Sequence, residues 1–418
     1  MEMTLRPLPF SLLAKPTGAA CNLDCTYCFF LSKELLYDAA GQRMSSDVLR
    51  AYLRGYLAAQ PVGDVTIAWQ GGEPTMRGLA FFKQAVVLAE QLKRSGQTLH
   101  HSLQTNGTLL DDDWGEFLAQ SGFLVGLSID GPQPLHDVYR VNKARRGTHA
   151  QVIRGWEVLR RHGVETNILC TVHRANQDHP LDVYRYFRDD LGAQFLQFIP
   201  IVERATPEEL PLAENGWKGD DGRRLFYRQE GGEVTSRSVS PEAFGAFLST
   251  IWDEWITRDV GRVYVQHFDV ALGNLFGRNE LCVHAPTCGG ALALEHNGDV
   301  YSCDHYVEPE YRLGNVLTDD LGALARTPAQ RAFGAAKANL TAQCRSCPVR
   351  WACHGGCPKD RFRLSRDGEP GQNYLCAGYY RFFTHATPGL KLMADLLTSG
   401  RAASEVMSLY CRGDDGIG

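Results

Sequence analysis

Three cysteines near the start of the chain have the residue type and the spacing of metal ligands. They are Cys21, Cys25 and Cys28, in the sequence Cys-Asn-Leu-Asp-Cys-Thr-Tyr-Cys. A structural zinc site normally uses four protein ligands, whereas three thiolates without a nearby fourth suit an iron–sulfur cubane whose remaining iron stays open. Because an open iron can bind a small molecule, this motif predicts a reactive cofactor site. A zinc site that borrows a distant ligand is the alternative.

Eight further cysteines lie late in the chain, at spacings that would complete two four-cysteine sites. They are Cys282, Cys288, Cys303, Cys344, Cys347, Cys353, Cys357 and Cys376. Spacing alone allows two sequential sites or an interleaved pair. Two structural zinc sites are a further alternative, because zinc ribbons use similar CxxC pairs. Cys170 and Cys411 are left over, and we expect both to be ordinary thiols.

Polar motifs follow the expected strands at the points where a ligand bound across a barrel mouth would need them. Gly71-Gly72-Glu73-Pro74 follows the second strand, Gln-Thr-Asn-Gly-Thr at 104–108 follows the third, and Ser128-Ile129-Asp130-Gly131 ends the fourth. Glycines let the backbone approach a ligand closely, and Glu73 can accept a hydrogen bond from an ammonium group. Taken alone, the first motif could also be a simple glycine turn.

The elements that must position these residues alternate between short apolar runs and segments of helical period up to about residue 200. This is the pattern of βα units around a parallel sheet. The expected strands are 10–14, 65–69, 99–103, 123–129, 166–172 and 195–199. The expected helices are 45–59, 79–94, 111–120, 150–162, 181–191 and 241–258. Six βα units fall short of a full eight-fold barrel, so we predict an α/β fold with a partial (β/α)6, TIM-like barrel.

Composition divides the rest of the chain. Residues 203–238 are rich in Gly, Glu and Arg and predict an irregular excursion, and after about residue 270 Gly, Pro and Cys rise while helical periodicity fades. Metal clusters would order such a segment, because ligand bonds replace the core it cannot build. The predicted domains are a partial barrel over 1–235, a linking helical region over 236–275, a cysteine-rich, loop-rich domain over 276–385, and a C-terminal helix and tail over 386–418.

The overall composition excludes several classes of protein. Hydrophobic residues make up 44% of the 418 and charged residues 22%, and no apolar run approaches the ~20 residues of a membrane helix. The first residues show no secretory signal, so we expect a cytoplasmic location, where thirteen cysteines are poor disulfide candidates. A net charge of −5 leaves no basic footprint for nucleic acid. We therefore expect small-molecule or protein partners, and neither nucleic acid nor a membrane.

Together, the motifs resemble those of a known enzyme superfamily. The CxxxCxxC spacing, with Tyr27 before the last cysteine, resembles the signature of radical S-adenosylmethionine enzymes. The later cysteines resemble the SPASM auxiliary-cluster domain over 281–379. The resemblance implies that S-adenosylmethionine binds the open iron as a cosubstrate and yields a 5′-deoxyadenosyl radical. Its expected contacts are Gly71, Gly72, Glu73, Ser128 and Arg140. A solvated surface arginine is the alternative for Arg140.

The resemblance also implies three [4Fe–4S] clusters, one open and two fully ligated. The first auxiliary cluster would take Cys282, Cys288, Cys303 and Cys357. The second would take Cys344, Cys347, Cys353 and Cys376.

Asp304 points to the reaction. It directly follows Cys303, at the position where anaerobic sulfatase-maturating enzymes carry an aspartate. The resemblance to that family implies that Asp304 deprotonates a thiol or hydroxyl while the radical takes a Cβ hydrogen and the second electron leaves through the auxiliary clusters. The substrate would be a cysteine or serine of an unfolded sulfatase, oxidised to Cα-formylglycine (3-oxoalanine), with flavodoxin or ferredoxin as electron donor. An aspartate that caps a turn is the alternative.

Two other functions fit parts of the pattern. A maturase of a ribosomally made peptide, forming a thioether or carbon–carbon crosslink, would share every cluster motif, although we expect no leader-binding domain before Phe10. A non-enzymatic electron carrier with several clusters would not need Glu73 or Ser128 at strand ends. The products formed from a sulfatase-derived peptide would separate these functions.

Overall fold

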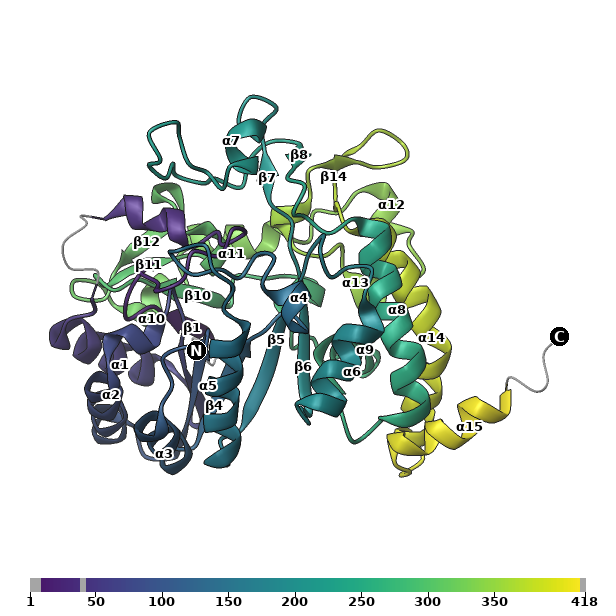
Figure 1. The fold of residues 1–418 in the computed structure, drawn as a ribbon, viewed down its shortest axis with the longest axis horizontal. Coiled ribbons are helices and arrows are strands. Elements are labelled where there is room, and N and C mark those ends of the chain that lie inside the picture. Colours follow the sequence, from purple (N-terminus) through teal and green to yellow (C-terminus); the bar gives the residue numbers. More distant parts are fainter. Residues whose placement is uncertain (1–8, 38–42, 414–418) are drawn as a thin grey trace, which may run out of the picture.

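A computed structural model describes residues 9–37 and 43–413 of the chain, with side chains described as far as residue 410. Over these residues a ten-stranded sheet has the order β12-β11-β10-β1-β2-β3-β4-β5-β6-β9, with helices packed along it (Figure 1). Two smaller sheets pair β7 with β8 and β13 with β14. The predicted α/β class with a parallel-stranded core is confirmed.

The first half of the chain alternates strands and helices as predicted. Its strands are β1 (Ser11–Ala14), β2 (Gly63–Trp69), β3 (Gln97–Thr105), β4 (Phe123–Ser128), β5 (Thr166–Val172) and β6 (Phe195–Pro200). Its helices are α1 (Ser46–Ala59), α2 (Leu79–Leu92), α3 (Asp112–Gln120), α4 (Gln133–His136), α5 (His149–Arg161) and α6 (Pro180–Arg185), which a π-helical turn (Tyr186–Asp190) continues. Neighbouring strands from β1 to β6 are parallel. Each of the six expected strands is confirmed, with its ends within two residues of the prediction.

Side-chain caps explain why several helices begin where the sequence indicates. Ser45 accepts a hydrogen bond from the N–H of Val48 at the start of α1, and Asp111 accepts one from Trp114 at the start of α3. Ser240 caps α8 (Pro241–Arg258) in the same way. Each cap satisfies a backbone N–H that has no partner within its helix.

The second half of the chain is less regular. Its strands are β7 (Arg204–Ala205), β8 (Glu233–Val234), β9 (Tyr264–Val265), β10 (Ala291–Leu294), β11 (Asp299–Tyr301), β12 (Arg312–Asn315), β13 (Arg363–Leu364) and β14 (Pro370–Gln372). Besides α8, its helices are α7 (Leu210–Glu214), α9 (Gln266–Leu275), α10 (Leu321–Leu324), α11 (Pro328–Ala336), α12 (Ala342–Arg345), α13 (Arg350–Cys353), α14 (Cys376–Thr398) and α15 (Val406–Gly413). The long α14 crosses the expected boundary between 385 and 386, because one apolar face continues along it.

Strands β10 to β12 belong to the cysteine-rich segment yet extend the barrel sheet. β10 pairs in parallel with β1, with Leu294 opposite Ala14, and β11 and β12 continue antiparallel. The sequence did not predict these strands, because β10 lies in the cysteine-rich segment and forms by pairing with the distant β1. Without β10, β1 would be an edge strand with unpaired backbone groups. The predicted domain division at 276 stays a prediction, but the sheet runs across it.

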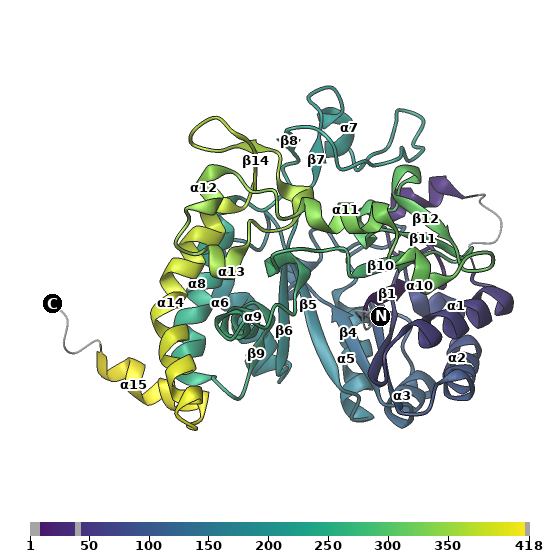
Figure 2. The same ribbon diagram turned by 180° about the vertical axis from the view of Figure 1, so that it is seen from behind.

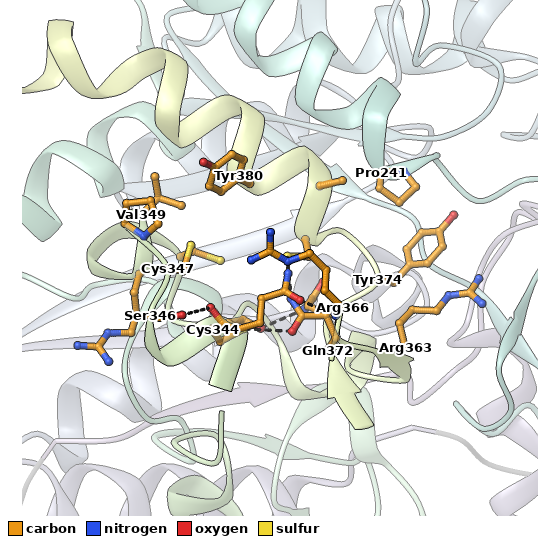
Figure 3. Close-up of a pocket in the computed structure, with 18 of the residues that line it drawn as sticks. Pro241, Cys344, Ser346, Cys347, Val349, Arg363, Arg366, Gln372, Tyr374 and Tyr380 are labelled. Atoms are coloured by element: carbon orange, nitrogen blue, oxygen red, sulfur yellow. Dashed lines mark hydrogen bonds between the residues drawn. The ribbon is translucent and has the colours of Figure 1, made fainter. Parts of the chain in front are cut away.

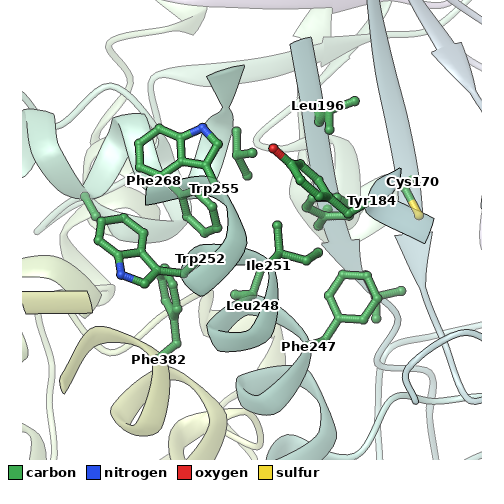
Figure 4. Packing of buried hydrophobic residues seen from close by; sticks show 14 of the residues in the cluster. Cys170, Tyr184, Leu196, Phe247, Leu248, Ile251, Trp252, Trp255, Phe268 and Phe382 are labelled. Carbon is green, nitrogen blue, oxygen red and sulfur yellow. The ribbon is translucent and has the colours of Figure 1, made fainter. Parts of the chain in front are cut away.

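Two apolar clusters form the core. One packs β1 to β4 against α1, α2 and α3. The other packs β5 and β6 against α8, α9 and α14, and α8 and α14 lie side by side in both views (Figures 1 and 2). Figure 4 shows Trp252 and Trp255 of α8 facing Phe268 of α9. Among the described residues, no helix is long and apolar enough to cross a membrane.

The predicted excursion at 203–238 contains β7, α7 and β8, which lie at the top of Figure 1. It has its own small apolar cluster, in which the rings of Trp217 and Tyr227 lie 4.6 Å apart. Two of its cations, Lys218 and Arg224, form ion pairs with Asp24 at 3.0 and 2.5 Å. Since Asp24 directly precedes Cys25, these ion pairs connect the excursion to the N-terminal cysteine loop.

Close contact between α8 and α14 predicts a stability defect in Gly245→Ala. A Cβ at Gly245 would lie 2.7 Å from the Cα of Gly378 in α14. We expect the free energy of unfolding to fall by roughly 1–3 kcal/mol, as in other overpacked cores, measured by thermal or denaturant unfolding. The matched control is Gly55→Ala in α1, whose nearest atom would be 3.4 Å away. Helix propensity predicts that this control is neutral or stabilising by up to ~1 kcal/mol. Equal stability of Gly245→Ala and the wild type would contradict the packing.

Candidate active site and cluster-binding loops

The loop after β1 carries the three N-terminal cysteines. Besides the larger effect of burial, nearby thiolates at Cys25 and Cys28 raise the thiol pKa of Cys21, and a thiolate at Cys28 raises that of Cys25, so the three residues lie close together. Burial raises the pKa of Cys25 to about 12, so its thiolate needs a nearby cation. Iron bound to the three sulfurs would supply that positive charge. The site therefore fits the predicted open cluster.

The glycines of the Gly71-Gly72-Glu73 motif brace this loop. The N–H of Gly72 donates to the carbonyl of Gly18 and that of Glu73 to the carbonyl of Ala20, both at 2.9 Å. A Cβ on Gly72 would lie 2.1 Å from the carbonyl oxygen of Ala20. In the described structure these glycines allow a close approach to the cysteine loop. The predicted approach to a bound ligand stays a prediction.

Glu73 is buried and joins the ends of β2 and β3. One carboxylate oxygen accepts hydrogen bonds from the N–H and hydroxyl of Thr75 and from the hydroxyl of Thr105, at 2.6–3.0 Å. The other accepts from the N–H of Asn106 at 2.7 Å. Burial raises the pKa of Glu73 although these hydrogen bonds oppose the shift. Asn106 in turn donates to Asn22 at 2.9 Å, so Glu73 supports the cysteine loop as well.

Arg140 and Ser128 lie near the carboxyl ends of β4 and β5. Ser128 accepts a hydrogen bond from Gln104 at 2.8 Å. The Arg140 Nε donates to Asp130 at 2.8 Å, and Tyr27 donates to the same carboxylate oxygen at 2.5 Å. Burial opposes ionisation of Asp130, but Arg140, His173 and His136 together outweigh it and hold the pKa of Asp130 well below its usual range. Arg140 is therefore a buried, paired cation, and the surface alternative for this residue is wrong.

The late cysteines form two groups. Besides the larger effect of burial, nearby thiolates at Cys357 and Cys282 raise the pKa of Cys303, and a thiolate at Cys282 raises the pKa of Cys288, so these thiols lie close together. The second group joins Cys353 with Cys344, Cys347 and Cys376. This grouping has the same members as the two interleaved sets that the resemblance implies, and the assignment of each set to a cluster stays a prediction. In the part of the chain that the structure describes, no His, Cys, Asp or Glu side chains converge as ligands of a single metal ion.

Two cations lie beside the late cysteines. The Lys337 ammonium donates to the carbonyl oxygens of Cys282 at 2.5 Å and Val283 at 3.0 Å. Burial lowers the pKa of Lys337 to about 8, although the nearby thiolates oppose the shift. Arg361 donates to the carbonyl of Lys337 at 2.7 Å and lies near cysteines of both groups. These cations would offset the charge of ligating thiolates, which favours cluster binding at both groups.

The second group of late cysteines lines a cavity of about 450 Å³ (Figure 3). Gln372 lies against two of its sulfurs: its amide nitrogen is 2.7 Å from Cys376 Sγ, and its carbonyl oxygen is 3.4 Å from Cys344 Sγ. Arg363 and Arg366 also line this cavity. The four cysteines of this group therefore line one cavity, together with Gln372.

Asp304 begins a short 3-10 turn directly after Cys303. Its Oδ1 atom lies 2.9 Å from the Nζ of Lys15, and its side chain keeps 13% of its surface exposed. Burial lowers the pKa of Lys15, but Asp304 and Glu295 reverse the effect and raise it above the ordinary value. Asp304 therefore faces a charged lysine on one side and remains accessible on the other.

The structure also contains residues whose importance the sequence did not indicate. Lys15 directly follows an expected strand, which was a usable signal because ligand-binding residues gather at that end of parallel strands. Asp130 lies inside a motif already recognised, whereas nothing in the spacing around Lys337 marks it. Of the two leftover cysteines, Cys170 is fully buried in β5, and the side chain of Cys411 lies outside the described ones.

Comparison with known proteins agrees with this arrangement. The Radical SAM superfamily matches residues 16–187 and SPASM, an iron–sulfur cluster-binding domain, matches 286–348. A serine-type anaerobic sulfatase-maturating enzyme of Bacteroides thetaiotaomicron is 42% identical over 96% of this chain and 94% of its own length. A cysteine-type enzyme of Clostridium perfringens is 33% identical over 91% of this chain and 97% of its own length.

Solved structures extend the likeness to three dimensions. Native anSMEcpe with bound AdoMet and Cp18Cys peptide has a TM-score of 0.80 and 32% identity, covering 93% of this chain and 100% of that chain. The similarity thus includes both the barrel and the cysteine-rich segment. The chain belongs to the anaerobic sulfatase-maturating enzymes, which are radical S-adenosylmethionine enzymes with a SPASM iron–sulfur domain.

Proposed function

We propose that the protein oxidises a cysteine or serine of a sulfatase polypeptide to Cα-formylglycine. The observation that carries this proposal is the position of Asp304. It directly follows Cys303 of the first late cysteine group, pairs with Lys15 at the end of β1, and remains partly exposed. A base that abstracts the substrate proton must reach the same residue that the radical attacks. The ion pair of Asp304 with Lys15 links the cysteine-rich segment to the mouth of the barrel. The substrate residue would lie at this mouth.

The proposed cofactor sites use the residues already described. Cys21, Cys25 and Cys28 would hold the open cluster, and the two late groups would hold the auxiliary clusters. Arg140 and Ser128 would bind S-adenosylmethionine, while Gly71, Gly72 and Glu73 would shape the loop around it and present a carboxylate to its ammonium group. When bound, the open cluster and S-adenosylmethionine supply the radical that removes hydrogen.

The reaction removes one hydrogen atom from Cβ of the target residue, one proton from its thiol or hydroxyl, and one electron. Asp304 accepts the proton, and Lys15 stabilises the carboxylate before the transfer. The oxidised cysteine is a thioaldehyde that water converts to the aldehyde with release of sulfide, whereas serine gives the aldehyde directly. The protein thus contributes binding, orientation and one proton acceptor.

The remaining partners follow from this reaction. An electron donor of the flavodoxin or ferredoxin type would reduce the open cluster. A newly made, unfolded sulfatase as substrate favours action in the cytoplasm. Since the relatives at 42% and 33% identity are named serine-type and cysteine-type respectively, both target residues are tested below. The peptide maturase that the motifs also allow would produce a crosslink in the same assay.

Iron analysis tests the number of clusters. Three plus eight cysteines fit one open and two complete [4Fe–4S] cubanes, so anaerobically prepared protein should be brown and contain about twelve iron atoms with matching sulfide. Zinc as the main metal, with little iron, would contradict the assignment.

Replacing Cys21, Cys25 and Cys28 together by Ala should abolish cleavage of S-adenosylmethionine. The late cysteine groups are formed by other segments, so about eight iron atoms should remain, which is the matched control for folding. Cleavage is measured as 5′-deoxyadenosine formed under strong reductant. Its continued formation would show that the cofactor site lies elsewhere.

Asp304→Asn should reduce formylglycine production by roughly 10²–10⁴-fold, the usual effect of losing a general base. The amide nearly conserves shape, so iron content and S-adenosylmethionine binding should be unchanged, and some unproductive cleavage should persist. The measurement is peptide mass together with 5′-deoxyadenosine yield, with the target cysteine or serine in a Cys/Ser-x-Pro-x-Arg peptide. Near-normal aldehyde formation by this variant would eliminate Asp304 as the base.

A further inference from the structure

Lys15 is a fully buried lysine whose ammonium group is surrounded by three partners. Its Nζ lies 2.9 Å from Oδ1 of Asp304, 3.0 Å from Oε1 of Glu295, and 4.3 Å from the centre of the Phe30 ring. Lysine is almost never fully buried unless it is paired. Glu295 is also fully buried, whereas Asp304 is partly exposed. The three charged groups therefore form a row from Glu295 in the interior, through Lys15, to the partly exposed Asp304.

The sheet fixes the position of Lys15. β1 and β10 are parallel with Ala14 opposite Leu294, so the next residues, Lys15 and Glu295, emerge side by side. The N–H of Lys15 also donates to the carbonyl of Leu294 at 2.9 Å. On the other side, a Cβ on Gly71 would lie 3.1 Å from the Cβ of Lys15, so the space there is just large enough for glycine. The lysine stem is therefore held between two neighbouring strands.

The Asp304 carboxylate is less constrained by its own backbone. It lies in a short turn, and its Oδ1 atom is buried against Lys15 while part of the side chain remains exposed. Among the ion pairs of the described residues, Lys15 is the one cation that contacts the Asp304 carboxylate. Its orientation thus depends on an ammonium group contributed by β1.

We propose that Lys15 is a positioning residue for the reaction. It holds one oxygen of Asp304 so that the rest of the carboxylate faces the substrate, and Glu295 holds Lys15 in turn. This inference rests on the proposed function, in which Asp304 accepts the substrate proton. In this proposal, a residue at the end of β1 orients the base, Asp304, which lies in the cysteine-rich segment.

The first test is Lys15→Met, which conserves the length of the side chain and removes its charge. Aldehyde formation should fall by roughly 10–10²-fold, the effect of a catalytic group displaced by about 1 Å. The KM for the peptide and the iron content should change little, whereas the melting temperature should fall because Glu295 loses its buried partner. With a target residue deuterated at Cβ, deuterium should still enter 5′-deoxyadenosine, because hydrogen abstraction does not use Lys15. Loss of this transfer together with aldehyde formation would indicate general damage and overturn the proposal.

The decisive test is a double-mutant cycle with Asp304→Asn. If Lys15 acts through Asp304, the double variant should be no slower than Asp304→Asn alone, within about twofold, because coupled residues are not additive. The matched control is Lys33→Met. Lys33 is another buried lysine, which pairs with Glu308 at 3.3 Å and lies over the ring of Phe226. The fold-reduction in rate of the double variant Lys33→Met/Asp304→Asn should equal the product of the reductions of the two single variants.

The outcomes separate the two proposals. A wild-type rate in Lys15→Met, or an effect that multiplies with Asp304→Asn, would overturn the positioning role. Near-normal aldehyde formation by Asp304→Asn alone would instead overturn the proposed function. If Lys15→Met does not fold, the cycle is repeated in a Glu295→Gln background, where a cation and a carboxylate are removed together. The same non-additivity is then expected.

Discussion

The buried ion pairs of Lys15 with Asp304 and Glu295 are the interaction on which the geometry of the site depends. Taking three charged groups out of water is costly, and their attraction offsets this cost only while all the partners stay in place. Removing one partner of a buried pair typically destabilises a protein by about 3–5 kcal/mol. Since Lys15 lies on the barrel and its partners lie on the cysteine-rich segment, this interaction ties the two regions together at the place where the chemistry is proposed.

Other charged groups at the strand ends are stabilised in different ways. Asp130 has an arginine partner, Arg140, and additional donors from Tyr27 and the backbone of Thr171. Among the described residues, the hydrogen-bond donors to the Glu73 carboxylate are neutral groups of Thr75, Thr105 and Asn106. In each case a carboxylate joins segments that are distant in sequence, as buried hydrogen-bonded networks do when every member is satisfied. The mouth of the barrel is thus organised largely by buried carboxylates.

Much of the fold could be predicted from the sequence, because it depends on local signals. The strand at 166–172 is a continuous β-rich run and the helix at 241–258 has a Ser240 cap, and both were predicted to the residue. β10 could not be predicted, since four apolar residues become a strand only beside β1. The cysteine motifs were visible in the spacing, but the grouping of Cys357 with Cys282 needed the resemblance to a known family. The partners of Lys15 are too distant in sequence for any local pattern to reveal.

The pairing of β1 with β10 also has a consequence for biosynthesis. The hydrogen bond from Ser11 to Gly290 joins residues 279 positions apart. Chains are made from the N-terminus at about 5–20 residues per second, so β1 emerges well before its partner on one side exists. Until then one edge of the growing sheet is open, and such edges are sites of mispairing and aggregation. The N-terminal cysteine loop follows this open edge directly. Closure of the sheet by β10 is therefore a late event in the life of the nascent chain, and it completes the barrel and the charged cluster in one step.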